Sequence, residues 1–131
     1  MLYCEEVLIP ANTLRSVPLK TQLDVVEGVV ARVWIRWRWG SANLAGCAIY
    51  RGGFQVWPTT GSRWFPSTVF DTVFDESYVV DDEPMHFILR TFNEDTRFPH
   101  RVWVGMSVLR PHYSDGMLGL MEYLNTPRKE F

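Results

Sequence analysis

Apolar and polar residues alternate along most of the chain between positions 19 and 110, as they do in strands with one buried face. The clearest case is Val29–Trp39, whose odd positions are all apolar and should face a core. Its even positions after Val30 are Arg32, Trp34, Arg36 and Arg38. We therefore expect a long half-buried strand here that carries guanidinium groups and one indole on its polar face.

Other short segments show the same alternation and are separated by turn residues. They are Leu19–Val25, Leu44–Tyr50, Phe54–Trp57, Thr68–Phe74, Tyr78–Val80, Met85–Phe92 and Arg101–Leu109. No apolar stripe of helical length occurs among them. About eight short strands at close spacing predict an all-β protein, a jelly-roll-like antiparallel β-sandwich over residues 19–110.

The first 18 residues follow a different pattern. Pro10 and Pro18 each remove a backbone donor and bias the preceding residue toward extended geometry. Residues 1–18 are therefore predicted to form an extended N-terminal arm, with a short strand around Glu6–Ile9.

Residues 111–131 are predicted to form a C-terminal tail with a short helix. Ser114 can cap this helix, and Pro127 would end it. Apolar residues recur between them at helical spacing, at Met117, Leu120, Met121 and Leu124. Because a short apolar helix is not stable alone, we expect it to pack on the sandwich or on a neighbouring molecule.

Size and charge narrow the choice of partners. The 131 residues are enough for one domain with a core. The formal net charge is only −2, which does not favour nucleic acid or an anionic membrane as a partner. Eleven arginines and only two lysines suit bidentate pairing and stacking on aromatic rings, as in protein contacts, although codon bias explains the excess equally well.

The residue types that hold metals do not cluster in the sequence. Cys4 and Cys47 lie outside any Cys-x-x-Cys motif, and a disulfide between them stays open. If Met85–Phe92 and Arg101–Leu109 form a hairpin, His86 and His100 lie at its opposite ends and cannot share a metal. We therefore expect no metal site and no cofactor.

The remaining candidates for chemistry are loop carboxylates. They occur in short groups such as 81–83 and 94–95, and they could hold Ca²⁺ or simply be solvated. No nucleophile motif or phosphate-binding loop is present. No catalytic residue is predicted, and the protein is expected not to be an enzyme.

The aromatic residues are the most informative feature, with six Trp, eight Phe and five Tyr. A small domain has difficulty burying all of them. Trp34 stands between two arginines, while Trp57, Trp64 and Phe65 flank a loop rich in Pro and Gly. Exposed Trp and Arg are typical of protein interfaces. The alternatives are stacking on sugar rings, a nucleic-acid surface and a second buried face.

Several short segments resemble a family of small virion proteins. They are Ile9-Pro10-Ala11-Asn12-Thr13, Val26-Glu27-Gly28-Val29-Val30, Gly53-Phe54-Gln55-Val56-Trp57-Pro58, and Phe92-Asn93-Glu94-Asp95 with Pro99-His100. In this order they resemble small β-sandwich structural proteins of tailed bacteriophages, over roughly residues 9–110. The resemblance implies capsid decoration, a tail accessory role or receptor binding.

Together these observations lead to one hypothesis. We expect a virion protein, a capsid decoration (cement) protein that binds the major capsid protein or other virion proteins and forms a homo-oligomer, taken as a trimer. The residues expected at interfaces are Arg32, Trp34, Arg36, Arg38, Trp57, Trp64, Phe65, Met117, Leu120, Met121 and Leu124. The alternative is a carbohydrate- or receptor-binding module of a phage tail or fibre. A third hypothesis, a small enzyme with a sandwich fold, would require His100 close to Glu94 or Asp95 inside a cleft.

Overall fold

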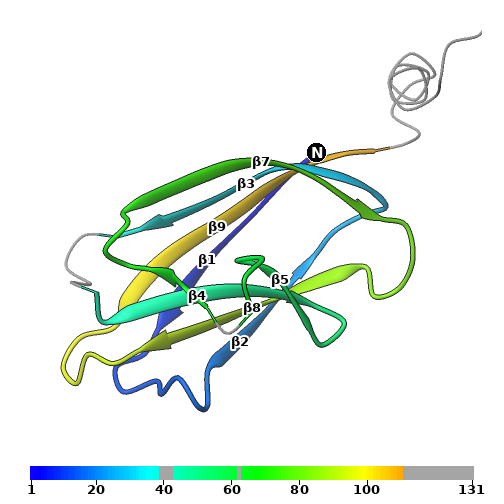
Figure 1. The fold of residues 1–131 in the computed structure, drawn as a ribbon. Helices are drawn as coiled ribbons and strands as arrows, with labels where there is room; N and C mark the ends of the chain where they lie inside the picture. The colour runs from blue at the N-terminus through cyan, green and yellow to red at the C-terminus, as the bar shows by residue number, and fades with distance from the viewer. Residues whose placement is uncertain (39–42, 62, 111–131) are drawn as a thin grey trace, which may run out of the picture.

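The computed structural model in Figure 1 describes residues 1–38, 43–61 and 63–110, which form two antiparallel sheets packed face to face. Sheet A contains, in spatial order, β1 (Leu2–Ile9), β9 (His100–Leu109), β3 (Gly28–Trp37) and β7 (Asp71–Val80). Sheet B contains β2 (Leu19–Asp24), β8 (His86–Asn93), β4 (Ala45–Arg51) and β5 (Phe54–Trp57), and β6 (Phe65–Pro66) also pairs with β4. The predicted all-β class, with two packed antiparallel sheets, is confirmed.

The chain passes repeatedly from one sheet to the other. β1, β2, β3 and β4 lie alternately in sheets A and B, and so do β7, β8 and β9 (Figure 1). Each sheet is therefore assembled from strands that are distant in sequence. None of the described residues belongs to a helix that could cross a membrane.

The inner faces of the two sheets meet in one apolar core. Sheet A contributes Val7, Ile9, Val33, Ile35, Trp37, Val102, Val104, Met106 and Val108, and sheet B contributes Leu23, Cys47, Ile49, Phe87 and Leu89. Complete burial of a Val, Leu, Ile or Phe side chain stabilises a fold by about 1.5–3 kcal/mol. The alternation seen in the sequence is thus the main cause of this two-layer arrangement.

A β-bulge near the start of β3 changes which residues of this strand face the core, compared with the alternation expected from the sequence. The register of β3 shifts between Val30 and Arg32 against both of its neighbours. Relative to β7, the extra residue lies in β7 itself, where Glu76 and Ser77 stand opposite Ala31. Relative to β9, Ala31 is an extra residue in β3, and it reverses which positions face inward, because successive side chains of a strand point to opposite sides. Val30 is consequently buried, whereas Val29 and Ala31 are only half-buried.

β7 is one strand of ten residues, and not two strands separated by a turn at positions 75–77. The polar residues of this stretch have partners within the sandwich. On the outer side Asp75 pairs with Arg32, and on the inner side Glu76 accepts a hydrogen bond from Trp57. These partners let a polar segment continue the sheet.

The hairpin considered for the segments that form β8 and β9 does not form. β8 pairs with β2 and β4, while β9 pairs with β1 and β3. The loop between them crosses from sheet B to sheet A and is held by the buried amide of Asn93. Its Nδ2 donates to the carbonyl oxygens of Ile9 at 3.2 Å and Phe98 at 2.9 Å, and its Oδ1 accepts from the backbone N–H of Asp95.

The two ends of the chain differ in how far the structure describes them. Residues 2–9 belong to sheet A, because β1 pairs with β9 along its whole length; they do not form an arm separate from the sandwich. Residues 10–18 connect the two sheets, with a bridge between Thr13 and Asn93. The predicted helix of the 111–131 tail lies outside the described residues.

Candidate functional site

The outer face of sheet A carries a row of apolar groups that crosses all four strands. In this row Cys4 of β1 faces Gly105 of β9, Gly105 faces Trp34 of β3, and Trp34 faces Val73 of β7. Each member of the row occupies an outward position of its strand. The four residues form a row because side chains in register across a sheet stand side by side. We call the surface around this row the Trp34 face.

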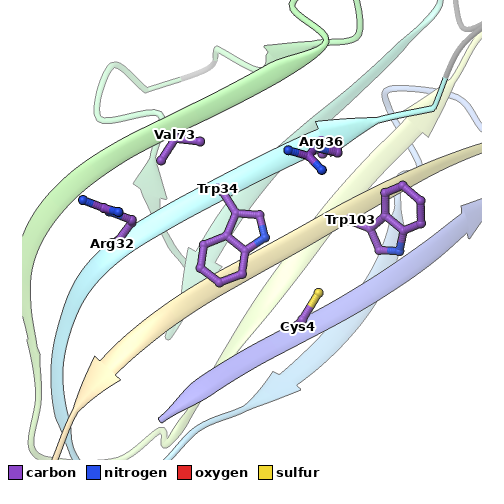
Figure 2. Close-up of a pocket in the computed structure, with 6 residues that line it drawn as sticks. All are labelled: Cys4, Arg32, Trp34, Arg36, Val73 and Trp103. Atoms are coloured by element: carbon purple, nitrogen blue, oxygen red, sulfur yellow. The ribbon is translucent and has the colours of Figure 1, made fainter.

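Trp34 lies across the backbone of the neighbouring strand β9. A β-carbon at Gly105 would stand 2.2 Å from the Cε2 and Cζ2 atoms of the Trp34 indole. Only glycine leaves room for the ring in this position. The indole is thereby half-buried against its own sheet, and Figure 2 shows the ring lying over β9.

A shallow depression of about 500 Å³ surrounds the indole. Its lining residues are Cys4, Arg32, Trp34, Arg36, Val73 and Trp103, and Figure 2 shows them along the four strands of sheet A. Three of these side chains are aromatic or aliphatic and two are guanidinium groups. The centre of the depression is therefore apolar and its edges are charged.

One ion pair lies on each side of the apolar row. Arg32 Nε lies 2.8 Å from Asp75 Oδ1, and an Arg36 terminal nitrogen lies 3.0 Å from Asp71 Oδ2. Exposed pairs of this kind contribute only about 0–1 kcal/mol to stability. Their main effect is to hold both guanidinium groups along the edge of the Trp34 face.

Glu6 fixes a second indole on the same face. Its carboxylate accepts a hydrogen bond from Arg101 at 2.7 Å and another from Trp103 Nε1 at 2.7 Å. Both bonds lower the pKa of Glu6, and the bond from Arg101 has the larger effect. The guanidinium of Arg38 lies 5.5 Å from the Trp103 ring centroid. Trp103 was missed in the sequence analysis, although its odd position between buried even positions of β9 indicates an outward side chain.

Exposed aliphatic side chains lie on the outer face of sheet A both within the depression and outside it. Val73, which lines the depression, is 55% exposed, while Leu2 and Val79 outside it are 68% and 53% exposed. All three occupy outward positions of β1 or β7. Polar residues such as Ser107 and Asp75 separate Leu2 and Val79 from Trp34 in the apolar row, so the row itself is the apolar centre of this face.

Both described cysteines are free thiols, which excludes the disulfide that the sequence left open. Cys4 lies in the depression, whereas Cys47 belongs to the core. Burial raises the pKa of Cys47 to about 12. Partial burial, with the nearby Glu5 and Glu6 charges, also raises the pKa of Cys4. Both thiols are therefore protonated at neutral pH, and neither is activated as a nucleophile.

The predicted interface residues do not all gather on one surface. Arg32, Trp34 and Arg36 line the depression, and Arg38 stacks beside it on Trp103. Trp57 is corrected to a core residue: it is 2% exposed because three aromatic rings surround it. These rings are Phe74, Tyr78 and Phe87.

The other predicted aromatic residues lie away from the Trp34 face. Trp64 contacts Phe92 edge to face at 4.8 Å on the outer side of sheet B, and the Arg15 guanidinium covers the same Phe92 ring at 4.4 Å. Phe65 belongs to β6 and lines a separate slot described below. Met117, Leu120, Met121 and Leu124 lie outside the described residues.

One histidine–carboxylate pair meets a geometric requirement of acid–base chemistry. His100 Nε2 lies 2.8 Å from Asp95 Oδ2. Asp95 also accepts bonds from the backbone N–H groups of Arg97 and Phe98, and these contacts, that of Arg97 first, lower its pKa. Neither side chain lines the Trp34 depression, the slot at Glu76 or the cavities around Trp64 and Val79. The pair closes the loop between β8 and β9.

Among the described residues, no three His, Cys, Asp or Glu side chains gather closely enough to hold a metal ion. The Trp34 depression, at about 500 Å³, is larger than the slot at Glu76 and the cavities around Trp64 and Val79, of about 300, 330 and 110 Å³, and its groups suit contact with another protein. Comparison of the chain with protein families, curated proteins and solved structures finds no match.

Proposed function

We propose that the protein is a non-enzymatic virion structural protein, a capsid decoration protein that binds capsid subunits through the Trp34 face. The observation that carries this proposal is the apolar row across sheet A, with Trp34 at its centre and ion pairs at its edges. Protein interfaces have this composition, an apolar aromatic centre within a polar rim. The resemblance to phage structural proteins supplies the virion context.

The rigidity of the Trp34 face supports a binding role. Trp34 is held against Gly105, and Trp103 is held by Glu6, so both indoles are positioned before any partner arrives. Preorganised side chains lose less conformational entropy on binding. A weak contact of this kind, repeated over many copies on a shell, stabilises the whole shell through avidity.

We also propose that the sandwich is a jelly roll. The neighbour orders β1-β9-β3-β7 and β2-β8-β4-β5 support this assignment. In both sheets strands from the start and the end of the chain lie next to each other, as two nested Greek keys require. Jelly rolls are common among viral capsid proteins, which agrees with the proposed role.

Carbohydrate or receptor binding on a phage tail is the second candidate. Stacking on a sugar ring needs an exposed flat aromatic face. Trp57 is buried, and Trp64 and Phe65 line different cavities. The Trp34 face therefore gives the protein-binding role the stronger support.

Cosedimentation with capsid shells tests the proposal. Purified protein is mixed with shells of the source virus that lack it, and the mass of the free protein is measured by analytical ultracentrifugation. We expect binding to the shells and self-association, with a trimer as the specific expectation. A chain that stays monomeric and does not sediment with shells contradicts the proposal.

A further inference from the structure

A second cavity, of about 300 Å³, lies where the edge of sheet A approaches the edge of sheet B. It is lined by Trp57, Pro58, Thr59, Phe65, Phe74 and Glu76. β7 contributes Phe74 and Glu76, while the others come from β5, β6 and the segment between them. We call this cavity the Glu76 slot. It shares no residue with the Trp34 face.

Three of the six residues that line the slot are aromatic. Phe65 and Phe74 are stacked, with ring centroids 5.9 Å apart and planes inclined by 26°. Trp57 contacts Phe74 at 6.1 Å, and its burial places it at the base of the slot. The faces of such rings are electron-rich and attract cations.

Glu76 contributes an ionised carboxylate to these rings. Its Oε2 accepts a hydrogen bond from Trp57 Nε1 at 2.9 Å, and its Oε1 accepts one from the Ser77 backbone N–H at 3.0 Å. Both bonds lower the pKa of Glu76, and the bond from Trp57 has the larger effect. Each carboxylate oxygen can accept a further contact.

The charge of Glu76 has no cationic partner within the described part of the chain. The ion pairs found there involve other carboxylates. Residues 51–100 contain four arginines and eight acidic residues, a local sum of −4. A cation entering the slot would therefore meet a favourable field.

The loop that forms the rim of the slot is held in place by one side chain. Gln55 Nε2 donates to the backbone carbonyl oxygens of Pro58 at 2.8 Å, Thr60 at 3.3 Å and Arg63 at 3.1 Å. Its Oε1 accepts a hydrogen bond from Tyr50. The slot is consequently formed before a ligand binds.

We propose that the Glu76 slot binds a small quaternary ammonium compound, with the methyl groups against Phe65 and Phe74 and the positive charge facing the Glu76 carboxylate. Such cations are recognised by aromatic cages, because they are weakly hydrated and have no N–H groups to satisfy. A metal ion would need several more oxygen ligands. An anion would be repelled by the carboxylate.

Choline and its neutral isostere 3,3-dimethylbutan-1-ol distinguish the proposed contact from ordinary apolar binding. Each is titrated into the intact protein while amide and indole N–H resonances are followed by NMR. We expect choline to shift the Trp57 indole and Ser77 amide signals and to bind about tenfold more tightly than the neutral alcohol. Equal affinities, or no shift with choline, overturn the proposal.

Two variants and one control locate the site. Glu76→Gln keeps an acceptor for Trp57 but removes the charge, and Phe65→Leu removes one aromatic face; both should weaken choline binding several-fold. Asp75→Asn removes the same charge from the opposite face of β7 and should leave choline binding unchanged. If Glu76→Gln does not fold, Phe65→Leu and the comparison of choline with its neutral isostere still test whether the slot binds the cation. Undiminished choline binding in folded Phe65→Leu or Glu76→Gln overturns the proposal.

Discussion

The indole of Trp34 occupies the space directly above Gly105, where a β-carbon would stand 2.2 Å from two of its ring atoms. This pair couples β3 to β9 on the face opposite the core. It also sets the height and tilt of the central side chain of the Trp34 face. The shape of the proposed interface thus depends on a residue that itself offers no side chain to a partner.

Gly105→Ala should therefore displace the indole. We expect a loss of about 1–3 kcal/mol in the free energy of unfolding, the usual cost of overpacking. Urea denaturation measures this loss. Gly61→Ala is the matched control, because a β-carbon there meets no atom within 4 Å. Equal stabilities of the two variants would show that the Trp34 ring moves without cost.

Asn93→Ala tests the crossing between sheets B and A. The buried amide bonds two carbonyl oxygens and one N–H group, all of which lose their partner in the variant. Each unsatisfied buried group costs about 1–3 kcal/mol, so we expect a large fall in the denaturant midpoint. Glu94→Ala is a surface control and should stay within about 0.5 kcal/mol of the wild type. Similar midpoints for both variants would contradict this role of Asn93.

The lowered pKa of Asp95 predicts an acid-dependent part of the stability. Because its folded pKa lies below the unfolded one, the ionised carboxyl stabilises the fold above the ordinary carboxyl range near pH 4, and this contribution is lost as the pH falls further. Asp95→Asn should therefore be less stable than the wild type at pH 7, and the gap should narrow in acid. Urea denaturation between pH 7 and acid measures both curves. Parallel curves contradict the expectation.

Cys4 provides a reporter for occupancy of the Trp34 face. It is exposed in the depression, whereas Cys47 is buried. Iodoacetamide should label one thiol of the native protein and two in denaturant, as read by mass spectrometry. Labelling of Cys4 should be slow at pH 7 and accelerate as the pH rises, because its pKa is raised and the thiolate is the reactive form. A bound partner should block it. Unchanged labelling in the complex would place the interface elsewhere.

Alternation between residues 19 and 110 was enough to predict most of the strands there and the all-β class, because each strand buries one face. It did not predict the full length of β1 or the continuity of β7. It could not predict pairing. β8 and β9 follow each other in sequence but belong to different sheets, since the core is closed by crossing the sandwich at Asn93. The bulge at Ala31 also left no sequence signal, because alanine fits either face.

The alternation of apolar and polar residues also predicted part of the candidate site. Trp34 interrupts a polar face between two arginines, so its outward position follows from strand parity alone. The burial of Trp57 does not follow, because an aromatic residue beside a Pro- and Gly-rich loop can point either way. The contact of Trp34 with Gly105 joins positions 71 residues apart (105 − 34) and requires the register of two strands.

Binding of wild type and Trp34→Ala to capsid shells tests the central claim most directly. Phe54→Ala is the control, because Phe54 is 79% exposed on β5 of the other sheet. Truncating a central interface tryptophan costs about 2 kcal/mol or more, so Trp34→Ala should bind at least tenfold more weakly, and Phe54→Ala should bind like the wild type. Folded Trp34→Ala that binds shells as tightly as the wild type would contradict the account.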